Sequence, residues 1–138
     1  MTGRTFLDTN ILVYAYDTHE LQKQRRAQEL LQRGIEDESA VLSAQVLSEF
    51  FTVVTRRIPN PLAVHEAEDA LNLVSILPVV ETDLLLIRRA IAIHSHYGIT
   101  YWDSLIVAAA ERSECVHIFS EDFNPGQSYS GIVAVNPF

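Results

Sequence analysis

Cysteine is nearly absent from this 138-residue sequence, in which Cys115 is the only one. One cysteine excludes an internal disulfide framework and a cysteine-rich zinc site, so we expect a reducing compartment, the cytoplasm. Long apolar stretches are absent too. The run 105–110 is far too short to span a membrane, and Asp8 interrupts the N-terminus before any run of signal-peptide length. We therefore expect no membrane association, and Cys115 should fill the core rather than act as a nucleophile.

Basic residues are scarce as well, because Lys23 is the only lysine and the formal net charge is -8. Proteins that hold nucleic acid by bulk electrostatics carry clustered Lys and Arg, so this charge argues against that mode of binding. It leaves open a site in which several carboxylates surround a divalent cation, because the ion reverses the local electrostatics. The arginines remain available for forked contacts to phosphate.

Several catalytic motifs are missing. The five glycines form neither a Gly-x-Gly-x-x-Gly pattern nor a Walker loop, which excludes dinucleotide cofactors and ATP hydrolysis. No Gly-x-Ser-x-Gly elbow occurs. The five histidines lack metalloprotease spacing with a glutamate, so we expect surface or core positions for them. These absences leave the carboxylates as the candidates for chemistry.

Short apolar segments alternate with segments of helical periodicity along the whole chain, which is 48% hydrophobic. This pattern predicts one α/β domain, residues 1–138, with a central, mostly parallel sheet of four to five strands between helices. The expected strands are 5–7, 40–42, 78–81, 117–120 and 132–135. We expect one helix after Asp8 and a second that ends at about Arg33, with Gly34 as its C-terminal stop. Further helices should cover 44–57, 62–73 and 84 to Gly98, and a last one should begin at Thr100.

Four carboxylates should converge at one edge of this sheet. Asp8 and Asp122 follow strands whose carboxyl ends lie at the same edge, where open α/β sheets bind ligands. Asp103 lies in the first turn of an apolar helix, and Glu49 approaches from the helix after the second strand. Hard cations such as Mg²⁺ prefer oxygen ligands and leave positions for water and phosphate. The four residues therefore predict a divalent-metal site.

Each carboxylate also has a purely structural interpretation. Asp8 would cap its helix, Thr100-x-x-Asp103 matches a capping box, and Asp122 would form an Asx turn. Glu49 would be a solvated residue on the flank of its helix. The metal site is favoured because an aspartate at the start of a buried helix, within Tyr-Trp-Asp-Ser-Leu-Ile, is costly to desolvate without a partner.

The segments around these carboxylates are similar to the four acidic motifs of a known family. The first segment is 6–13, which contains Leu-Asp-Thr-Asn, and the second is 46–50, which contains Leu-Ser-Glu-Phe. The third is 101–106, which contains Tyr-Trp-Asp-Ser, and the fourth is 119–123, Phe-Ser-Glu-Asp-Phe. They resemble those of PIN-domain ribonucleases, in particular VapC-type toxins of type II toxin–antitoxin systems. The resemblance covers essentially the whole chain.

The resemblance implies a PIN-like α/β/α sandwich and an endoribonuclease that cleaves single-stranded RNA with Mg²⁺ or Mn²⁺. The residues that it implies as catalytic and metal-binding are Asp8, Glu49, Asp103 and Asp122. Thr9 and Ser120 would support them by hydrogen bonds to a carboxylate or to a bound water. The adjacent Glu121 leaves open which carboxylate of the last motif faces the metal.

The resemblance further implies a homodimer held inactive by a cognate VapB-type antitoxin. We expect the helices 44–57 and 62–73 to form the partner surface, because Phe50 and Phe51 together give more aromatic bulk than one helix face needs. A stand-alone PIN nuclease would carry the same four carboxylates.

Three alternatives remain at this point. A haloacid dehalogenase-like phosphatase would need a second aspartate two residues after Asp8, where this chain has Asn10, and Lys23 lies in the wrong half of the chain for its lysine. A phosphoacceptor receiver domain would also need a late lysine. A non-catalytic binding module with the same fold is the third alternative, because fold alone never settles function.

Overall fold

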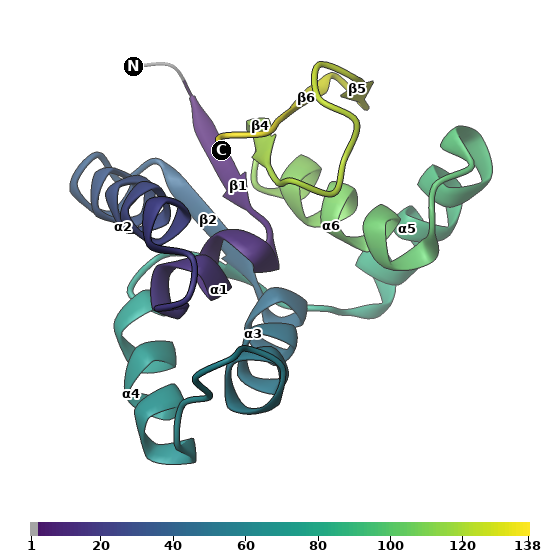
Figure 1. Ribbon diagram of the computed structural model, residues 1–138. Coiled ribbons are helices and arrows are strands. Elements are labelled where there is room, and N and C mark those ends of the chain that lie inside the picture. Colours follow the sequence, from purple (N-terminus) through teal and green to yellow (C-terminus); the bar gives the residue numbers. More distant parts are fainter. Residues whose placement is uncertain (1–2) are drawn as a thin grey trace.

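The computed structural model describes residues 3–138 and shows one sheet with helices on both sides (Figure 1). The strands within these residues are β1 Arg4–Leu7, β2 Ala40–Ser43, β3 Val79–Val80, β4 Cys115–Phe119, β5 Ser128–Tyr129 and β6 Ile132–Val135. The helices are α1 Thr9–Tyr16, α2 Leu21–Glu36, α3 Ala44–Arg56, α4 Val64–Val74, α5 Leu84–Tyr97 and α6 Tyr101–Arg112. In Figure 1, α1 to α4 occupy the left of the view, whereas α5 and α6 occupy the right.

The sheet has the strand order β3-β2-β1-β4-β6-β5. Every neighbouring pair is parallel except β5 and β6, which are antiparallel. The prediction of a mostly parallel sheet is therefore confirmed, and the described residues add a sixth strand to the predicted five. The two residues of β5, Ser128 and Tyr129, are too few to show an alternating pattern, which is why the sequence did not reveal this strand.

The helices begin where polar side chains cap them. Ser43 Oγ accepts a hydrogen bond from the Val46 amide at 3.2 Å at the start of α3, and Asp83 Oδ1 accepts from the Leu86 amide at 2.9 Å at the start of α5. Gly98 ends α5 in the left-handed conformation at φ 69°, which a residue without a Cβ adopts freely. These predicted boundaries are confirmed.

Two other predicted boundaries are wrong. Gly34 does not stop α2, which continues to Glu36. A Cβ at position 34 would lie 2.4 Å from the Ala40 Cβ, so this glycine allows α2 to pack closely on β2 rather than end. The helix expected at 62–73 begins at Val64, because Ala63 is still extended at ψ 157° and serves as the N-cap.

The core lies between the sheet and the helices on both sides, and it includes Phe50 and Cys115. Phe50 is fully buried and packs edge-on against Tyr16 at 5.6 Å between ring centroids. The expectation that Phe50 belongs to a partner surface is therefore wrong, whereas Phe51 is only partly buried. Cys115 is also buried, and burial raises the pKa of its thiol to about 12, so it is core filling as expected. Within residues 3–138, no helix is both long enough and apolar enough to cross a membrane.

Candidate active site

The strand register brings Asp8 and Ser120 together. Leu7 pairs with Phe119 across β1 and β4, and the Asp8 amide donates to the Phe119 carbonyl at 3.0 Å. The next residues of the two strands therefore lie side by side at the carboxyl edge. The Ser120 hydroxyl donates to Asp8 Oδ2 at 2.7 Å, and the Thr9 amide donates to Oδ1 at 2.7 Å. Asp8 thus caps α1, and it also takes part in a contact between two strands.

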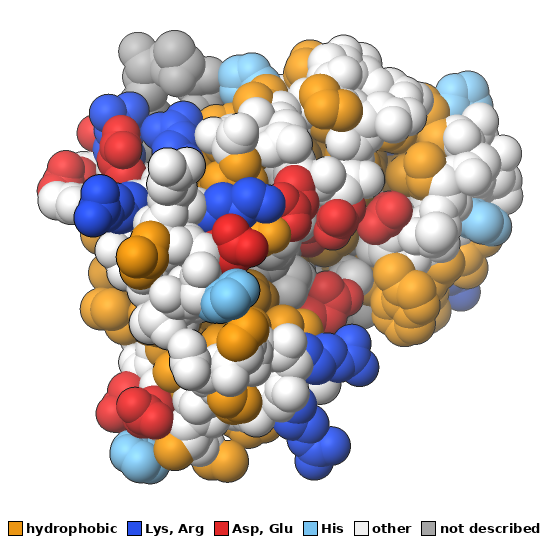
Figure 2. Space-filling model, viewed as in Figure 1, with side chains coloured by type: hydrophobic (Ala, Val, Ile, Leu, Met, Phe, Trp, Pro, Cys, Tyr) orange, Lys and Arg blue, Asp and Glu red, His pale blue; other side chains and the backbone are white. Residues whose placement is uncertain are grey.

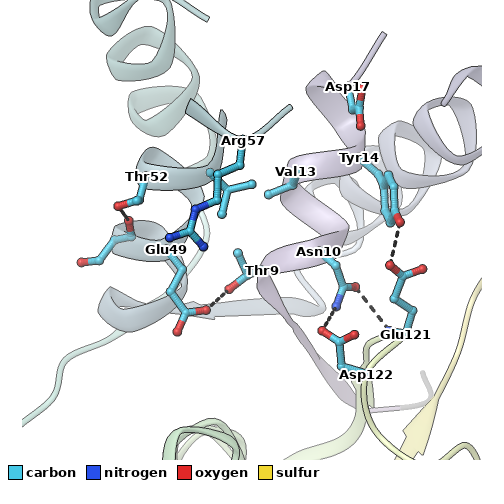
Figure 3. A pocket seen from close by; sticks show the side chains of 12 residues that line it. Thr9, Asn10, Val13, Tyr14, Asp17, Glu49, Thr52, Arg57, Glu121 and Asp122 are labelled. Carbon is cyan, nitrogen blue, oxygen red and sulfur yellow. Dashed lines mark hydrogen bonds between the residues drawn. The ribbon is translucent and has the colours of Figure 1, made fainter. Parts of the chain in front are cut away.

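Asn10 connects this pair to the last acidic motif. Its Nδ2 donates to Asp122 Oδ2 at 3.2 Å and to Ser120 Oγ at 3.3 Å, while its Oδ1 accepts from the Glu121 amide at 3.3 Å. The Asp122 amide also donates to Ser120 Oγ at 3.0 Å. Figure 3 shows the Asn10 amide pointing from α1 toward Asp122. The turn after β4 is therefore held against the first turn of α1.

Glu49 reaches the site from α3. The Thr9 hydroxyl donates to Glu49 Oε2 at 2.7 Å, and Gln45 Nε2 donates to Oε1 at 3.1 Å. Gln45 Nε2 also donates to the Trp102 carbonyl at 3.2 Å, which ties α3 to the start of α6. Both oxygens of Glu49 are thus hydrogen-bonded, and Thr9 lies between this carboxylate and Asp8. Glu49 is not the freely solvated flank residue of the structural interpretation.

Asp103 lies in the first turn of α6. Its main-chain amide donates to Thr100 Oγ1 at 3.1 Å, so Thr100 caps the helix through a group that any residue at position 103 would supply. Burial raises the pKa of the Asp103 carboxyl, the Thr100 side chain opposes that rise, and the negative charges of Asp122 and Glu49 raise it further. The Asp103 carboxylate is therefore within electrostatic reach of two other members of the group.

The electrostatic strain of the group is greatest at Asp8. Burial raises the pKa of its carboxyl to about 6, against opposing hydrogen bonds from Ser120 and the Thr9 amide, while Asp122 and Glu49 add like-charge repulsion. The structure thus brings all four predicted carboxylates into one electrostatic cluster around the carboxyl ends of β1 and β4. A carboxylate kept in such a setting is stabilised by a nearby cation.

The chemistry of the donor set fits a hard divalent cation, because each side chain of the group offers carboxylate oxygens. The geometry is not preformed. Among residues 3–138, no three His, Cys, Asp or Glu side chains are arranged as ligands of one ion. Asp8 and Glu49 use their oxygens in the hydrogen bonds described above, so these bonds have to exchange or water has to bridge when an ion enters.

Glu121 faces away from this cluster. The Tyr14 hydroxyl donates to Glu121 Oε1 at 2.6 Å, and Lys23 Nζ forms an ion pair with Oε2 at 3.1 Å. Lys23 Nζ also donates to the Tyr14 hydroxyl at 3.2 Å and lies 4.7 Å from the centre of its ring. Asp122 therefore lies next to Asn10 and Ser120, whereas the Glu121 carboxylate is held by side chains of α1 and α2.

A hollow of about 700 Å³ opens beside the cluster, and Glu49 and Asp122 line it. Figure 2 shows acidic side chains gathered around the hollowed centre of this face, with basic side chains nearby. Arg57 is the only Lys or Arg that lines it, and in Figure 3 its guanidinium reaches from the end of α3 toward Glu49 and Val13. Within residues 3–138, Arg57 forms no salt bridge. We call this hollow the Arg57 hollow; it combines carboxylates with one arginine that has no salt-bridge partner within residues 3–138.

Sequence reasoning did not identify three residues that shape the site, namely Asn10, Gln45 and Arg57. Asn10 entered only as a capping residue type and as the reason to set aside a phosphatase. Its position two residues after Asp8, in the first turn of a helix that starts at a strand end, was the available signal. Gln45 reaches from α3 to α6, and Arg57 lines the hollow. No spacing in the sequence predicts either position.

Comparison with known proteins agrees with this architecture. A sequence model of the PIN domain family matches residues 5–125, and the chain belongs to that family. This membership sets aside the phosphatase and receiver alternatives. No curated protein matches the sequence.

Solved structures of similar fold include proteins of toxin–antitoxin systems. A toxin–antitoxin complex from Klebsiella pneumoniae superposes with a TM-score of 0.68 at 17% identity, over 97% of this chain and 98% of that chain. DNA-bound VapBC from Salmonella typhimurium gives 0.68 at 16% identity, over 99% of both chains. VapC20 from Mycobacterium tuberculosis, a toxin that cleaves the sarcin–ricin loop, gives 0.58 at 17% identity, over 86% of this chain and 89% of that chain. At these identities the likeness concerns the fold.

Proposed function

We propose that this PIN domain is a Mg²⁺- or Mn²⁺-dependent endoribonuclease that cleaves single-stranded RNA. The observation that carries the proposal is the electrostatic coupling of Asp8 and Asp103 to Glu49 and Asp122, two carboxylates that line an open hollow together with Arg57. Like charges gathered in this way destabilise the fold, which is typical of a site that binds a cation. VapC20, which shares the fold, is described as a toxin that cleaves the sarcin–ricin loop.

The four carboxylates would hold the ion, some directly and some through water, as the small Mg²⁺ ion prefers. The bound cation supplies polarisation of the scissile phosphodiester and of the attacking water. Asp8 is ionised in that state, because a neighbouring positive charge lowers its pKa. Thr9 keeps Glu49 oriented, Ser120 keeps Asp8 oriented, and Asn10 does the same for Asp122.

Arg57 would contact a phosphate of the substrate. A guanidinium presents a planar fork of donors that matches phosphate oxygens. Its position in the same hollow as Glu49 and Asp122 supports this contact. One such cation partly offsets the repulsion that RNA meets from a protein of net charge -8.

The experiment that tests this function is cleavage of a short unstructured RNA by purified protein freed of any partner. We expect cleavage with Mg²⁺ or Mn²⁺ and none in excess EDTA, with recovery when the metal is restored. Asp103→Asn protein purified in parallel controls for contaminating ribonucleases. Cleavage that persists in EDTA, or that the variant preparation shows equally, would return us to a metal-free mechanism or to a non-catalytic binding module.

We also propose that the protein is the toxin of a toxin–antitoxin pair, bound by a VapB-type antitoxin and dimeric, rather than a stand-alone nuclease. Two of the structures with this fold are described as a toxin–antitoxin complex and as VapBC. The partner surface would use α3 and the exposed Val64 and Leu73 of α4, while buried Phe50 takes no part. Light scattering of the native preparation should show a dimer or a complex with a small protein. A strict monomer without any small companion would contradict this assignment.

A further inference from the structure

A second hollow, of about 600 Å³, opens beside the first on the other side of Glu49. Ser48 and Glu49 line both hollows, so the two meet at the candidate metal site. Thr82, Trp102, Leu105 and Gln45 contribute to the second one, which we call the Trp102 hollow. Unlike the Arg57 hollow, it is lined by no Lys or Arg. It therefore offers nothing to a phosphate and presents mainly apolar and amide surface.

The indole of Trp102 is unusually placed for so large an apolar group. It is 62% exposed, although the neighbouring Asp103 belongs to the candidate site and the rest of α6 from Ser104 to Ala110 is buried. Its position is also restrained. The Tyr101 ring packs edge-on against it at 5.1 Å between centroids, and Gln45 Nε2 holds its carbonyl at 3.2 Å. Exposing a fixed aromatic ring loses hydrophobic stabilisation, so an occupant that covers it gains that free energy.

Gln45 ties the main chain at Trp102 to Glu49 at the edge of the same hollow. Its Nε2 faces two acceptors, Glu49 Oε1 and the Trp102 carbonyl, which fixes the orientation of the amide because a flipped oxygen would meet both. Its Oε1 is then buried and has no hydrogen-bond partner within residues 3–138. Because this oxygen is closed to solvent, an occupant of the Trp102 hollow meets mainly the indole and the other lining side chains. The occupant should therefore present a flat apolar face.

We propose that the Trp102 hollow is a nucleotide subsite, in which the indole stacks on an unpaired base next to the scissile phosphate. The inference rests on the ribonuclease function proposed above and names the part of the substrate that this surface takes. A nucleobase has the required flat face, and stacking on aromatic side chains is a general mode of single-strand recognition. The Arg57 hollow then binds a backbone phosphate of the RNA, and the Trp102 hollow binds a base. The RNA strand passes over Glu49 between the two hollows.

This division of labour explains how an acidic protein can hold RNA. Phosphate contacts normally dominate affinity and require many cations. With Arg57 as the only cation of the two hollows, base stacking has to supply a larger share of the binding free energy. Because every base has a π-face, the subsite tolerates all four bases and requires only that the base be unpaired.

The sole tryptophan of the chain makes the subsite directly observable. In EDTA, where the proposed nuclease is inactive, titration with an unstructured oligoribonucleotide should quench and shift the fluorescence of Trp102. The matching oligonucleotide in a fully paired duplex should produce little change. Unchanged fluorescence under conditions where anisotropy of a labelled RNA reports binding would overturn the proposal, because RNA would then bind without covering the indole.

Kinetics on the metal-loaded protein provide the second test. Trp102→Ala should raise KM for single-stranded RNA by roughly 5- to 100-fold, the range reported for loss of one stacked base, with a much smaller change in kcat. Trp102→Phe keeps an aromatic face and should restore most of the loss, which also covers the case in which the alanine variant folds poorly. Ile76→Ala is the matched control, because Ile76 is 64% exposed and lines neither hollow. It should leave KM unchanged.

A cycle with abasic RNA separates stacking from other effects. Removing the base next to the cleavage site should weaken the wild type as much as Trp102→Ala does, and the two losses should not add. Additive losses would overturn the proposal. A second result would also overturn it. If the Trp102→Ala protein keeps the wild-type KM for RNA but binds its small protein partner less tightly, the indole is a protein contact. If the wild type cleaves no RNA at all, the ribonuclease function fails, while the fluorescence titration still decides whether a base binds here.

Discussion

The candidate site consists of two halves that are positioned in different ways. Asp8 and Asp122 follow the adjacent strands β1 and β4, and main-chain register, Ser120 and Asn10 hold them together through five hydrogen bonds. Glu49 and Asp103 come from α3 and α6, and they meet the first half through side-chain reach and electrostatics. The first half is fixed by the pairing of the strands, whereas the second half is placed by the packing of α3 and α6.

The difference separates stability from activity. A change in the strand-end half should alter both, because the same hydrogen bonds hold the turn after β4 against α1. A change at Asp103 should remove activity without lowering metal-free stability, because Thr100 Oγ1 caps α6 by accepting from the Asp103 amide, which a side-chain substitution keeps. Residues of the second kind are the better probes of catalysis, since a loss of activity in them is not explained by a loss of fold.

The largest expected effect is on cleavage by Asp103→Asn. We expect a loss of about 10²- to 10³-fold or more, the range for removal of one preorganised electrostatic group, together with loss of the stabilisation that Mg²⁺ provides. Metal-free stability should stay unchanged or rise by about 0.5–2 kcal/mol, because one of several repelling charges is removed. Thermal melting with and without Mg²⁺, next to a cleavage assay, measures both quantities.

A matched control is Asp69→Asn on α4, an exposed aspartate that lines neither hollow. It should change neither cleavage nor the response to Mg²⁺. If Asp103 served only as a capping-box residue, Asp103→Asn would instead lower stability by roughly 0.3–1 kcal/mol and leave cleavage intact. A destabilised variant that cuts RNA at the wild-type rate would remove Asp103 from the site.

The contrast between the halves also explains what the sequence could predict. A strand that ends on Asp8 and another that ends just before Asp122 are local patterns, and parallel pairing follows from the alternation of strands and helices. The convergence of the carboxylates was therefore predictable from topology. Their catalytic and metal-binding roles stay predictions, which the cleavage and melting measurements on Asp103→Asn test.

The features that the sequence did not predict depend on contacts between distant elements. Gly34 reads as a helix stop, yet its function is visible only beside Ala40 on β2. Asn10 reads as a capping residue until Asp122 and Glu121 lie next to it. Trp102 sits in an apolar segment whose pattern predicts burial, and the exposed indole appears only once α3 and α6 are placed. In each case a residue's role is set by a partner that periodicity does not locate.

The strand-end half should also make stability depend on pH. The folded pKa of Asp8 is about 6, above its ordinary value of 3.8. The folded state therefore holds a proton that the unfolded state has released, and this contribution to stability is complete below about pH 4 and lost as the pH rises through about 6. The loss amounts to at most about 3 kcal/mol. Because other groups titrate too, the measurement is the difference in unfolding free energy between Asp8→Asn and wild type, in EDTA, from pH 4 to 7.5. That difference should move in favour of the variant as the pH rises, and a flat difference would contradict the buried setting of Asp8.

Ser120→Ala sharpens the same measurement with a smaller expected effect. The Ser120 hydroxyl donates to Asp8 Oδ2 and lowers the Asp8 pKa, so its removal should move the pH window upward. It should also lower stability by about 1–2 kcal/mol near neutral pH, because a buried carboxylate loses a donor and Asn10 and the Asp122 amide lose an acceptor. A magnesium titration distinguishes the two halves, because at saturating Mg²⁺ the Ser120→Ala defect should shrink as the cation takes over the charge of Asp8, whereas Asp103→Asn should gain little from the metal. If Mg²⁺ stabilises both variants equally, the two halves are not distinct, and the ion does not bind between them.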